Sequence, residues 1–336
     1  MNQQQLMEDS LVIDDAIQQK VFRLSEKYKE VDQNIACHLD RLYYTEHTKY
    51  WDYIHTDTLL SIQHPKTTFS DEMIFIVYHQ ITELYFKLII SEIRKITGTK
   101  NICDEDFLVG LMRMNRYYEN LIYSFDIMID GLDQKQFLEF RYALWPASGF
   151  QSAQFREIEL MATDLENLRA LSYREQPSFE EGRNKLKELY NQIYWKTGAT
   201  DVKNGKRDLS LVHFIEKYDW TLLNHAIKFE NKNLWQVFKN LDSKTITSPE
   251  REKVVMELRR LDMLANIDWR LAHYKAAIRH LRTNVEVKEG TGGTNWQAYL
   301  PPRFQKIIFF PKLWTKQERE NWGKTWVIGA LNQSFK

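Results

Sequence analysis

Hydrophobic residues recur at helical spacing in several long segments of the chain. The segment 72–96, EMIFIVYHQITELYFKLIISEIRKI, is apolar on nearly every face, which is typical of a central helix buried on all sides. Helical spacing returns over 104–129 and 179–196, and a long helix is expected over roughly 248–283. The sequence contains no alternating strand pattern and no internal repeat. It therefore predicts an all-α fold built around a single helical domain.

The first part of the chain has a different pattern. Residues 3–36 predict a charged, weakly amphipathic helical arm, in which a few apolar residues are separated by many Gln, Glu and Lys. Such an arm has little to bury against itself, so we expect residues 1–47 to pack on another part of the protein or on a second subunit. Residues 48–336 are expected to form the helical domain. The polar, acidic N-terminus is not a secretory signal.

Composition supports this picture and excludes several classes of protein. Seven prolines and 12 glycines are few for 336 residues, which favours long uninterrupted helices. Lys plus Arg and Asp plus Glu are 46 each, and this balance argues against general electrostatic binding to nucleic acid or to an anionic membrane. No segment has about 18 uninterrupted apolar residues, the approximate minimum for a membrane span. We expect a soluble protein.

The two cysteines, Cys37 and Cys103, lie in unrelated contexts. They form neither a disulfide framework nor a CxxCH motif, so covalent attachment of haem through such a motif is excluded. Their small number fits a reducing cytoplasm.

Among the nine histidines, two stand out by their context, because HExxH and the common nucleotide-binding and hydrolase motifs are absent. His79 lies in the middle of the apolar segment, between Phe75 and Glu83, where a core histidine bonded to a carbonyl or carboxylate is the commoner case. His273 lies in the amphipathic segment NIDWRLAHYKAAIRH. A neutral imidazole that projects from a helix into an apolar cavity is a standard axial ligand of haem iron. His280, two turns later, is a competitor for that role.

Two further segments carry polar groups suited to a small anionic ligand. Arg156 follows a Ser-Gly-Phe-Gln-Ser turn, where its guanidinium could bind a carboxylate in bidentate fashion, although a plain ion pair is the commoner case. The segment EGTGGT, 289–294, offers backbone N–H groups and Thr hydroxyls to a carboxylate or a haem propionate. Its alternative interpretation is an ordinary glycine-rich turn. None of these features decides the function alone.

Four of these segments occur together in a recognisable order. DEMIFIVYHQITELYFK, SGFQSAQFR, WRLAH and GTGG resemble, in this order, motifs of the bacterial tryptophan 2,3-dioxygenase family, and the resemblance runs from about residue 50 to residue 300. It implies an all-helical cytoplasmic dioxygenase with one non-covalent haem b per subunit. Such an enzyme inserts both atoms of O2 across the indole C2–C3 bond of L-tryptophan and gives N-formyl-L-kynurenine, the first step of tryptophan catabolism through kynurenine. The resemblance also implies a homotetramer, a dimer of dimers.

The resemblance assigns roles to individual residues. It implies that His273, in preference to His280, is the axial ligand of the haem iron, and that His79 is the distal histidine near the indole nitrogen. The substrate-binding residues that it implies are Phe75 beside the indole, Arg156 on the carboxylate, Thr291 on the ammonium and carboxylate, and Tyr50 and Tyr53 in a neighbouring subunit's active site. The spacing from His273 to Thr291 is about four residues longer than the family pattern leads us to expect, so Thr294 is the alternative to Thr291.

Three other functions remain open at this stage. The longer spacing before Thr291 keeps a haem-dependent monooxygenase of another aromatic amino acid on the same scaffold as an alternative. A haem-binding sensor or carrier without catalysis is a second, although it would have no use for the carboxylate-binding arginine Arg156. In the third, the protein is a haem-free helical scaffold in which His79 and His273 are ordinary core residues.

Overall fold

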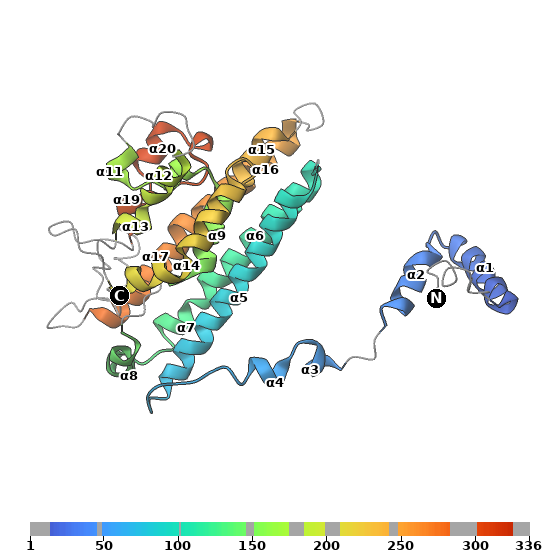
Figure 1. Cartoon of the computed structure of the whole chain (residues 1–336), viewed down its shortest axis with the longest axis horizontal. Helices are drawn as coiled ribbons and strands as arrows, with labels where there is room; N and C mark the ends of the chain where they lie inside the picture. The colour runs from blue at the N-terminus through green and yellow to red at the C-terminus, as the bar shows by residue number, and fades with distance from the viewer. Residues whose placement is uncertain are drawn as a thin grey trace, which may run out of the picture. The chain divides into compact units, whose positions relative to one another are not determined.

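A computed structural model of the chain describes residues 14–45, 49–100, 102–145, 151–174, 185–198, 209–241, 248–282 and 301–324. Within these ranges the regular elements are helices, and the only extended pairing between two described residues is an isolated bridge between Arg169 and Ile193. The all-α prediction is therefore confirmed. The chain divides into two compact units, Met1–Ile62 and Gln63–Lys336 (Figure 1).

The smaller unit contains the four short helices α1 (Asp15–Lys29), α2 (Ile35–Tyr43), α3 (Tyr50–Tyr53) and α4 (Thr56–Leu59). Asp14 and Asn34 cap the first two, because each side chain accepts a hydrogen bond from the backbone N–H two residues later. Asp32 lies between them with φ 54°, a left-handed conformation that a continuous helix cannot contain. The helical arm expected over 3–36 is described from residue 14 onward, where a turn separates α1 from α2. None of the four helices buries a side chain within the described chain.

The larger unit is a bundle of long helices. α5 (Asp71–Gly98) packs against α6 (Asp104–Ser124) and α9 (Ala153–Ala162), α14 (Leu209–Phe229) packs against α9, and α16 (Ser248–Met263) packs against α6. Figure 1 shows α5, α6 and α16 running along one another. A π-helix, η3 (Leu264–Asp268), joins α16 to α17 (Trp269–Leu281), so the helix expected over 248–283 contains a wider turn.

Shorter helices accompany this bundle. The remaining elements are α7 (Asp126–Ile129), α8 (Gln134–Phe140), η1 (Arg141–Leu144), α10 (Leu165–Leu168), α11 (Leu171–Arg174), α12 (Lys185–Asn191), α13 (Tyr194–Gly198), α15 (Leu234–Asn240), α19 (Pro302–Gln305), η4 (Pro311–Leu313) and α20 (Lys316–Glu320).

The predicted helices differ from the observed ones in three further places. The helix expected over 104–129 ends at Ser124 and is followed by a separate turn of helix, α7. α14 corresponds to no helix that the sequence pattern predicted. The segment expected over 179–196 is described from residue 185 onward, where it forms two short helices, α12 and α13, interrupted at Ile193.

α5 differs from the prediction that it is buried on all sides. One face lies in the core through Tyr78, Phe86, Ile89, Ile93 and other residues. The opposite face carries five exposed hydrophobic side chains, those of Met73, Val77, Ile81, Leu84 and Leu88. By length and composition alone, α5 is also the one described helix that could cross a membrane, a property that it shares with core helices of soluble proteins.

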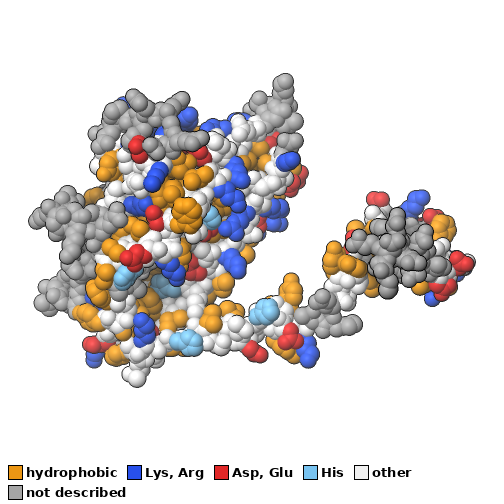
Figure 2. All heavy atoms as spheres, in the orientation of Figure 1, with side chains coloured by type: hydrophobic (Ala, Val, Ile, Leu, Met, Phe, Trp, Pro, Cys, Tyr) orange, Lys and Arg blue, Asp and Glu red, His pale blue; other side chains and the backbone are white. Residues whose placement is uncertain are grey.

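Charge is unevenly distributed over the larger unit. Figure 2 shows Lys and Arg side chains gathered over the region of α6 and α16. The neutral net charge of the chain therefore coexists with a locally basic face.

Candidate functional site

The first part of the candidate site lies on α5. Phe75 and His79 are one helical turn apart, with ring centroids 4.1 Å apart, and Nδ1 of His79 donates to the backbone carbonyl of Phe75 at 2.7 Å. This bond leaves Nε2 as the unprotonated nitrogen of a neutral ring. Burial lowers the pKa of His79, and its effect exceeds the opposing effects of the Phe75 carbonyl and the Glu83 carboxylate. His79 is therefore a neutral imidazole at physiological pH.

The second part lies on α17. His273 follows Trp269 by one turn, and both rings contact Phe125 at the end of α6, at centroid distances of 5.7 and 5.0 Å. Burial lowers the pKa of His273 to about 4, with a further lowering by His79. Its ring makes no hydrogen bond to any residue that the structure describes. A neutral imidazole with an available ring nitrogen is the form that binds a metal.

The two histidines belong to one aromatic-walled region. Each comes from a different long helix, and the ring of Tyr78 lies 5.7 Å from that of His79 and 5.4 Å from that of Phe125, which in turn contacts His273. The electrostatic effect of His79 on His273 also requires that they be near one another. Two neutral imidazoles and an aromatic lining fit a haem group, which needs one axial nitrogen and apolar walls.

A protein-held metal without haem lacks support among the described residues, where no three His, Cys, Asp or Glu side chains are grouped to hold an ion. A cavity of about 840 Å³ lined by α16, η3 and Trp314 contains none of the predicted site residues. Neither feature competes with the region around His79 and His273.

His280 has a different environment from His273. Its side chain is buried, and Nε2 donates to the backbone carbonyl of Met128. The ring also packs on Phe137 at 5.2 Å. This is the ordinary role of a core histidine, in which the imidazole satisfies a buried acceptor.

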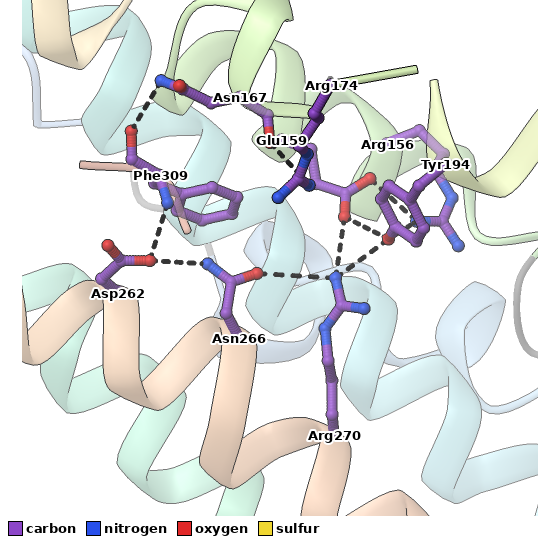
Figure 3. A network of polar contacts seen from close by, with 9 residues as sticks. All are labelled: Arg156, Glu159, Asn167, Arg174, Tyr194, Asp262, Asn266, Arg270 and Phe309. Carbon is purple, nitrogen blue, oxygen red and sulfur yellow. Dashed lines mark hydrogen bonds and ion pairs between the residues drawn. The ribbon is translucent and has the colours of Figure 1, made fainter. Parts of the chain in front are cut away.

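Arg156 lies in a separate buried cluster on α9. Ser152 caps this helix by accepting from the N–H of Phe155, which fixes the turn that carries Arg156. Nη1 of Arg156 donates to Glu159 Oε2 at 2.8 Å and to the hydroxyl of Tyr194 at 2.7 Å (Figure 3). Burial lowers the pKa of the guanidinium, but Tyr194 and Glu159 more than compensate and leave it raised.

The ion pair that the sequence allowed for Arg156 is therefore present within the chain. Its predicted contact with a substrate carboxylate stays a prediction.

The remaining predicted residues are placed as follows. Tyr50 and Tyr53 lie on α3 in the smaller unit, with 73% and 77% of their surface exposed. Thr291 and its alternative Thr294 lie outside the described residues. The structure thus brings Phe75, His79 and His273 into one region.

Sequence reasoning missed three residues that surround Arg156. They are Glu159, Tyr194 and Arg270, and Nη2 of Arg270 donates to Glu159 Oε1 at 3.2 Å and to the Tyr194 hydroxyl at 2.9 Å. Arg270 is part of the WRLAH segment, one turn before His273. Spacing alone placed Glu159 one turn after Arg156, but no signal in the sequence pointed to Tyr194.

Known proteins resemble this chain over most of its length. A family model described as tryptophan 2,3-dioxygenase matches residues 40–240. A tryptophan 2,3-dioxygenase of Bacillus anthracis is 29% identical over 289 residues, which cover 81% of this chain and 92% of that protein. One of Pseudomonas fluorescens is 28% identical over 291 residues, or 83% and 93% of the two chains. One of Sorangium cellulosum is 40% identical over 128 residues, 35% of this chain and 31% of its own.

Proposed function

The chain belongs to the tryptophan 2,3-dioxygenase family and is an enzyme of that kind, and on this premise we propose that it binds haem b and converts L-tryptophan and O2 to N-formyl-L-kynurenine. In this proposal His273 would hold one non-covalent haem in each subunit through its iron. Both oxygen atoms enter the product as the indole C2–C3 bond opens. The reaction is then the first step of tryptophan catabolism through kynurenine, in the cytoplasm.

One observation carries the proposal for haem. The ring of His273 is neutral and lies in the same aromatic region as His79. It makes no hydrogen bond to the described residues. Its competitor His280 is occupied by the carbonyl of Met128. When bound, haem supplies the oxygen chemistry, while the protein supplies orientation and a dry pocket.

The residues of α5 orient the substrate. Because Nδ1 of His79 donates to the Phe75 carbonyl, its Nε2 is left to accept a hydrogen bond from the indole N–H. The ring of Phe75 offers an apolar surface to the indole. His79 is proposed to orient the substrate and not to act as an obligatory base, because the indole N–H is a very weak acid.

The amino acid part of the substrate needs charged partners. We assign its carboxylate to the guanidinium of Arg156, and its ammonium and carboxylate to Thr291, with Thr294 as the alternative. The contacts of Arg156 with Glu159 and Tyr194 support this assignment, since they hold the guanidinium in place before a substrate arrives.

The proposed assembly is a homotetramer, a dimer of dimers, in which Tyr50 and Tyr53 reach the active site of a neighbouring subunit. It is supported by the smaller unit, whose helices bury no side chain within the described chain and expose Tyr50, Trp51 and Tyr53. Light scattering of the full chain should give four times the mass of 40.4 kDa. A monomer of full activity would contradict this assembly.

The reaction itself is tested by mass spectrometry. The protein is reconstituted with haem, reduced, and supplied with L-tryptophan and ¹⁸O₂. The expected product is N-formyl-L-kynurenine that carries two labelled oxygens. A product with one labelled oxygen and an intact ring would indicate a monooxygenase instead, and bound haem without oxygen uptake would indicate a sensor or carrier.

A further inference from the structure

The carboxylate of Glu159 lies between two arginines from different helices. Its side chain is 1% exposed, with Oε2 bound to Arg156 on α9 and Oε1 bound to Arg270 on α17. The hydroxyl of Tyr194 donates to Oε1 at 2.5 Å and accepts from both guanidinium groups (Figure 3). Four side chains from three helices thus form one buried contact cluster.

This cluster contains two guanidinium groups and one carboxylate. Glu159 and Tyr194 each contact both guanidinium groups, so they link Arg156 to Arg270. A buried charge is costly unless it is paired, so these contacts stabilise both arginines in the interior.

Arg270 also connects this cluster to the helix that carries His273. The two residues are three positions apart on α17, which is about one turn of helix. On its other side, Arg270 donates to Asn266 Oδ1 at 3.5 Å, and Asn266 donates to the buried carboxylate of Asp262 at 2.9 Å. Its side chain is therefore held by the helix behind it as well as by Glu159 in front of it.

We propose that Arg270 is a positioning residue, which holds Arg156 through Glu159 and Tyr194 and thereby sets the carboxylate-binding guanidinium relative to His273 on α17. This inference rests on the proposed function of Arg156 and His273. In this proposal Arg270 acts through Glu159 and Tyr194 and is assigned no contact with substrate or cofactor. Its role is to fix α9 to α17, the helix that carries His273, through the contact with Glu159.

The proposal is tested with two ligands of the haem-reconstituted enzyme. L-Tryptophan carries the carboxylate that Arg156 would bind, and tryptamine is the same molecule without that group. Their dissociation constants are measured by calorimetry in the wild-type protein, in Arg270→Gln and in Arg270→Lys. The preference for L-tryptophan over tryptamine should fall about tenfold or more in Arg270→Gln, because coupled charged residues typically interact at this level.

Further readouts separate positioning from a structural effect. Arg270→Gln should retain the haem absorption spectrum and bind tryptamine as the wild type does, and Arg270→Lys should recover part of the preference because it keeps the charge. Arg174→Gln is the matched control. Arg174 is a half-buried arginine whose guanidinium donates to the backbone carbonyls of Arg169, Lys306 and Asn167, and none of its described hydrogen bonds goes to Glu159 or Arg156. This control should leave the preference unchanged.

Two results would overturn the inference. One is an unchanged preference for L-tryptophan in Arg270→Gln. The other is an equal loss of affinity for L-tryptophan and for tryptamine, which would indicate a general disruption of the site. If Arg270→Gln does not fold, Tyr194→Phe serves in its place, because it removes the hydroxyl that joins the same groups. Tyr194→Phe should reduce the preference for L-tryptophan by a smaller factor. An unchanged preference in this variant would contradict the proposal. Failure of the proposed function is distinguished because the wild type would then show no preference at all.

Discussion

The Nε2 atom of His280 donates to the backbone carbonyl of Met128, and this bond ties α17 to the end of α7. His273, two turns earlier on the same helix, makes no such bond among the residues described. One helix thus carries one histidine engaged in structure and one that is available to a ligand.

Substitution of the two histidines should therefore have opposite consequences. His273→Ala should lose the absorption spectrum of axially ligated haem. His280→Ala should keep that spectrum but unfold more easily, by about 1–3 kcal/mol, because the buried Met128 carbonyl loses its donor. Absorption spectra after reconstitution and urea unfolding curves measure the two effects. Loss of the spectrum in His280→Ala alone would transfer the ligand role to His280.

Removal of the Arg156 guanidinium should weaken substrate binding strongly. Arg156→Ala leaves the substrate carboxylate without its charged partner, at a cost of about 2–5 kcal/mol, so KM for L-tryptophan should rise by one order of magnitude or more. The Glu159 carboxylate keeps Arg270 and Tyr194 as partners, so the fold should survive. Steady-state kinetics measure KM, with tryptamine binding as the control. An unchanged KM would remove Arg156 from the site.

The helical placement of the candidate residues could be predicted because it depends on local pattern, whereas the roles proposed for them came from the family resemblance. His79 and His273 each lie in a continuous helical segment, and the helical repeat alone places Phe75 one turn from His79. The contacts of Arg156 could not be predicted in the same way. Glu159 and Arg270 are 111 positions apart in the chain, and they meet only because α9 and α17 pack in the same bundle. A local hydrophobic pattern contains no information on such a pairing.

The fold shows the same limit. Hydrophobicity alone predicted that α5 is buried throughout, yet one face with Met73 and Leu88 is exposed within the described chain. An apolar pattern predicts that a helix face is buried, but it does not predict whether the same subunit or another one buries it. Likewise, the left-handed Asp32 and the π-helix Leu264–Asp268 each change a single turn inside a pattern that otherwise continues as a helix.

The carboxyl group of Asp268 should contribute to the pH dependence of the free energy of unfolding. Burial raises the pKa of its carboxyl to about 6, against the smaller effect of Lys275, and the group makes no hydrogen bond to the described residues. Because the folded pKa lies above the unfolded value of 3.8, the folded chain prefers the protonated form. The free energy of unfolding should therefore decrease as the pH rises from about 4 to 6.

Asp268→Asn should remove this contribution. Above pH 6 the variant is expected to be more stable than the wild type by about 1–3 kcal/mol, since it avoids a buried charge. Urea unfolding of both proteins at pH 4, 5, 6 and 7 gives the difference at each pH. The buried histidines, which have lowered pKa values and the opposite pH dependence, contribute equally to both proteins and cancel. A difference that is constant with pH would contradict the assignment.

Asp262 should be the anchor of the segment that follows α19. Its buried carboxylate accepts from the backbone N–H groups of Phe309 and Phe310 at 2.8 and 3.0 Å, and from the indole nitrogen of Trp314 at 3.0 Å. Asp262→Asn keeps the size of the side chain but replaces one acceptor oxygen with an NH₂ donor. At least one of the three N–H groups then loses its acceptor, which should cost about 1–3 kcal/mol of stability.

The matched comparison is again Asp268→Asn, in which the same change touches no described hydrogen bond. Asp262→Asn should lower the midpoint of urea unfolding and speed limited proteolysis within residues 301–324, whereas Asp268→Asn at neutral pH should do neither. The reason is geometric, since of these two carboxylates Asp262 alone accepts described hydrogen bonds from that segment. Equal proteolysis rates in wild type and Asp262→Asn would show that the Asp262 carboxylate is not what holds Phe309, Phe310 and Trp314.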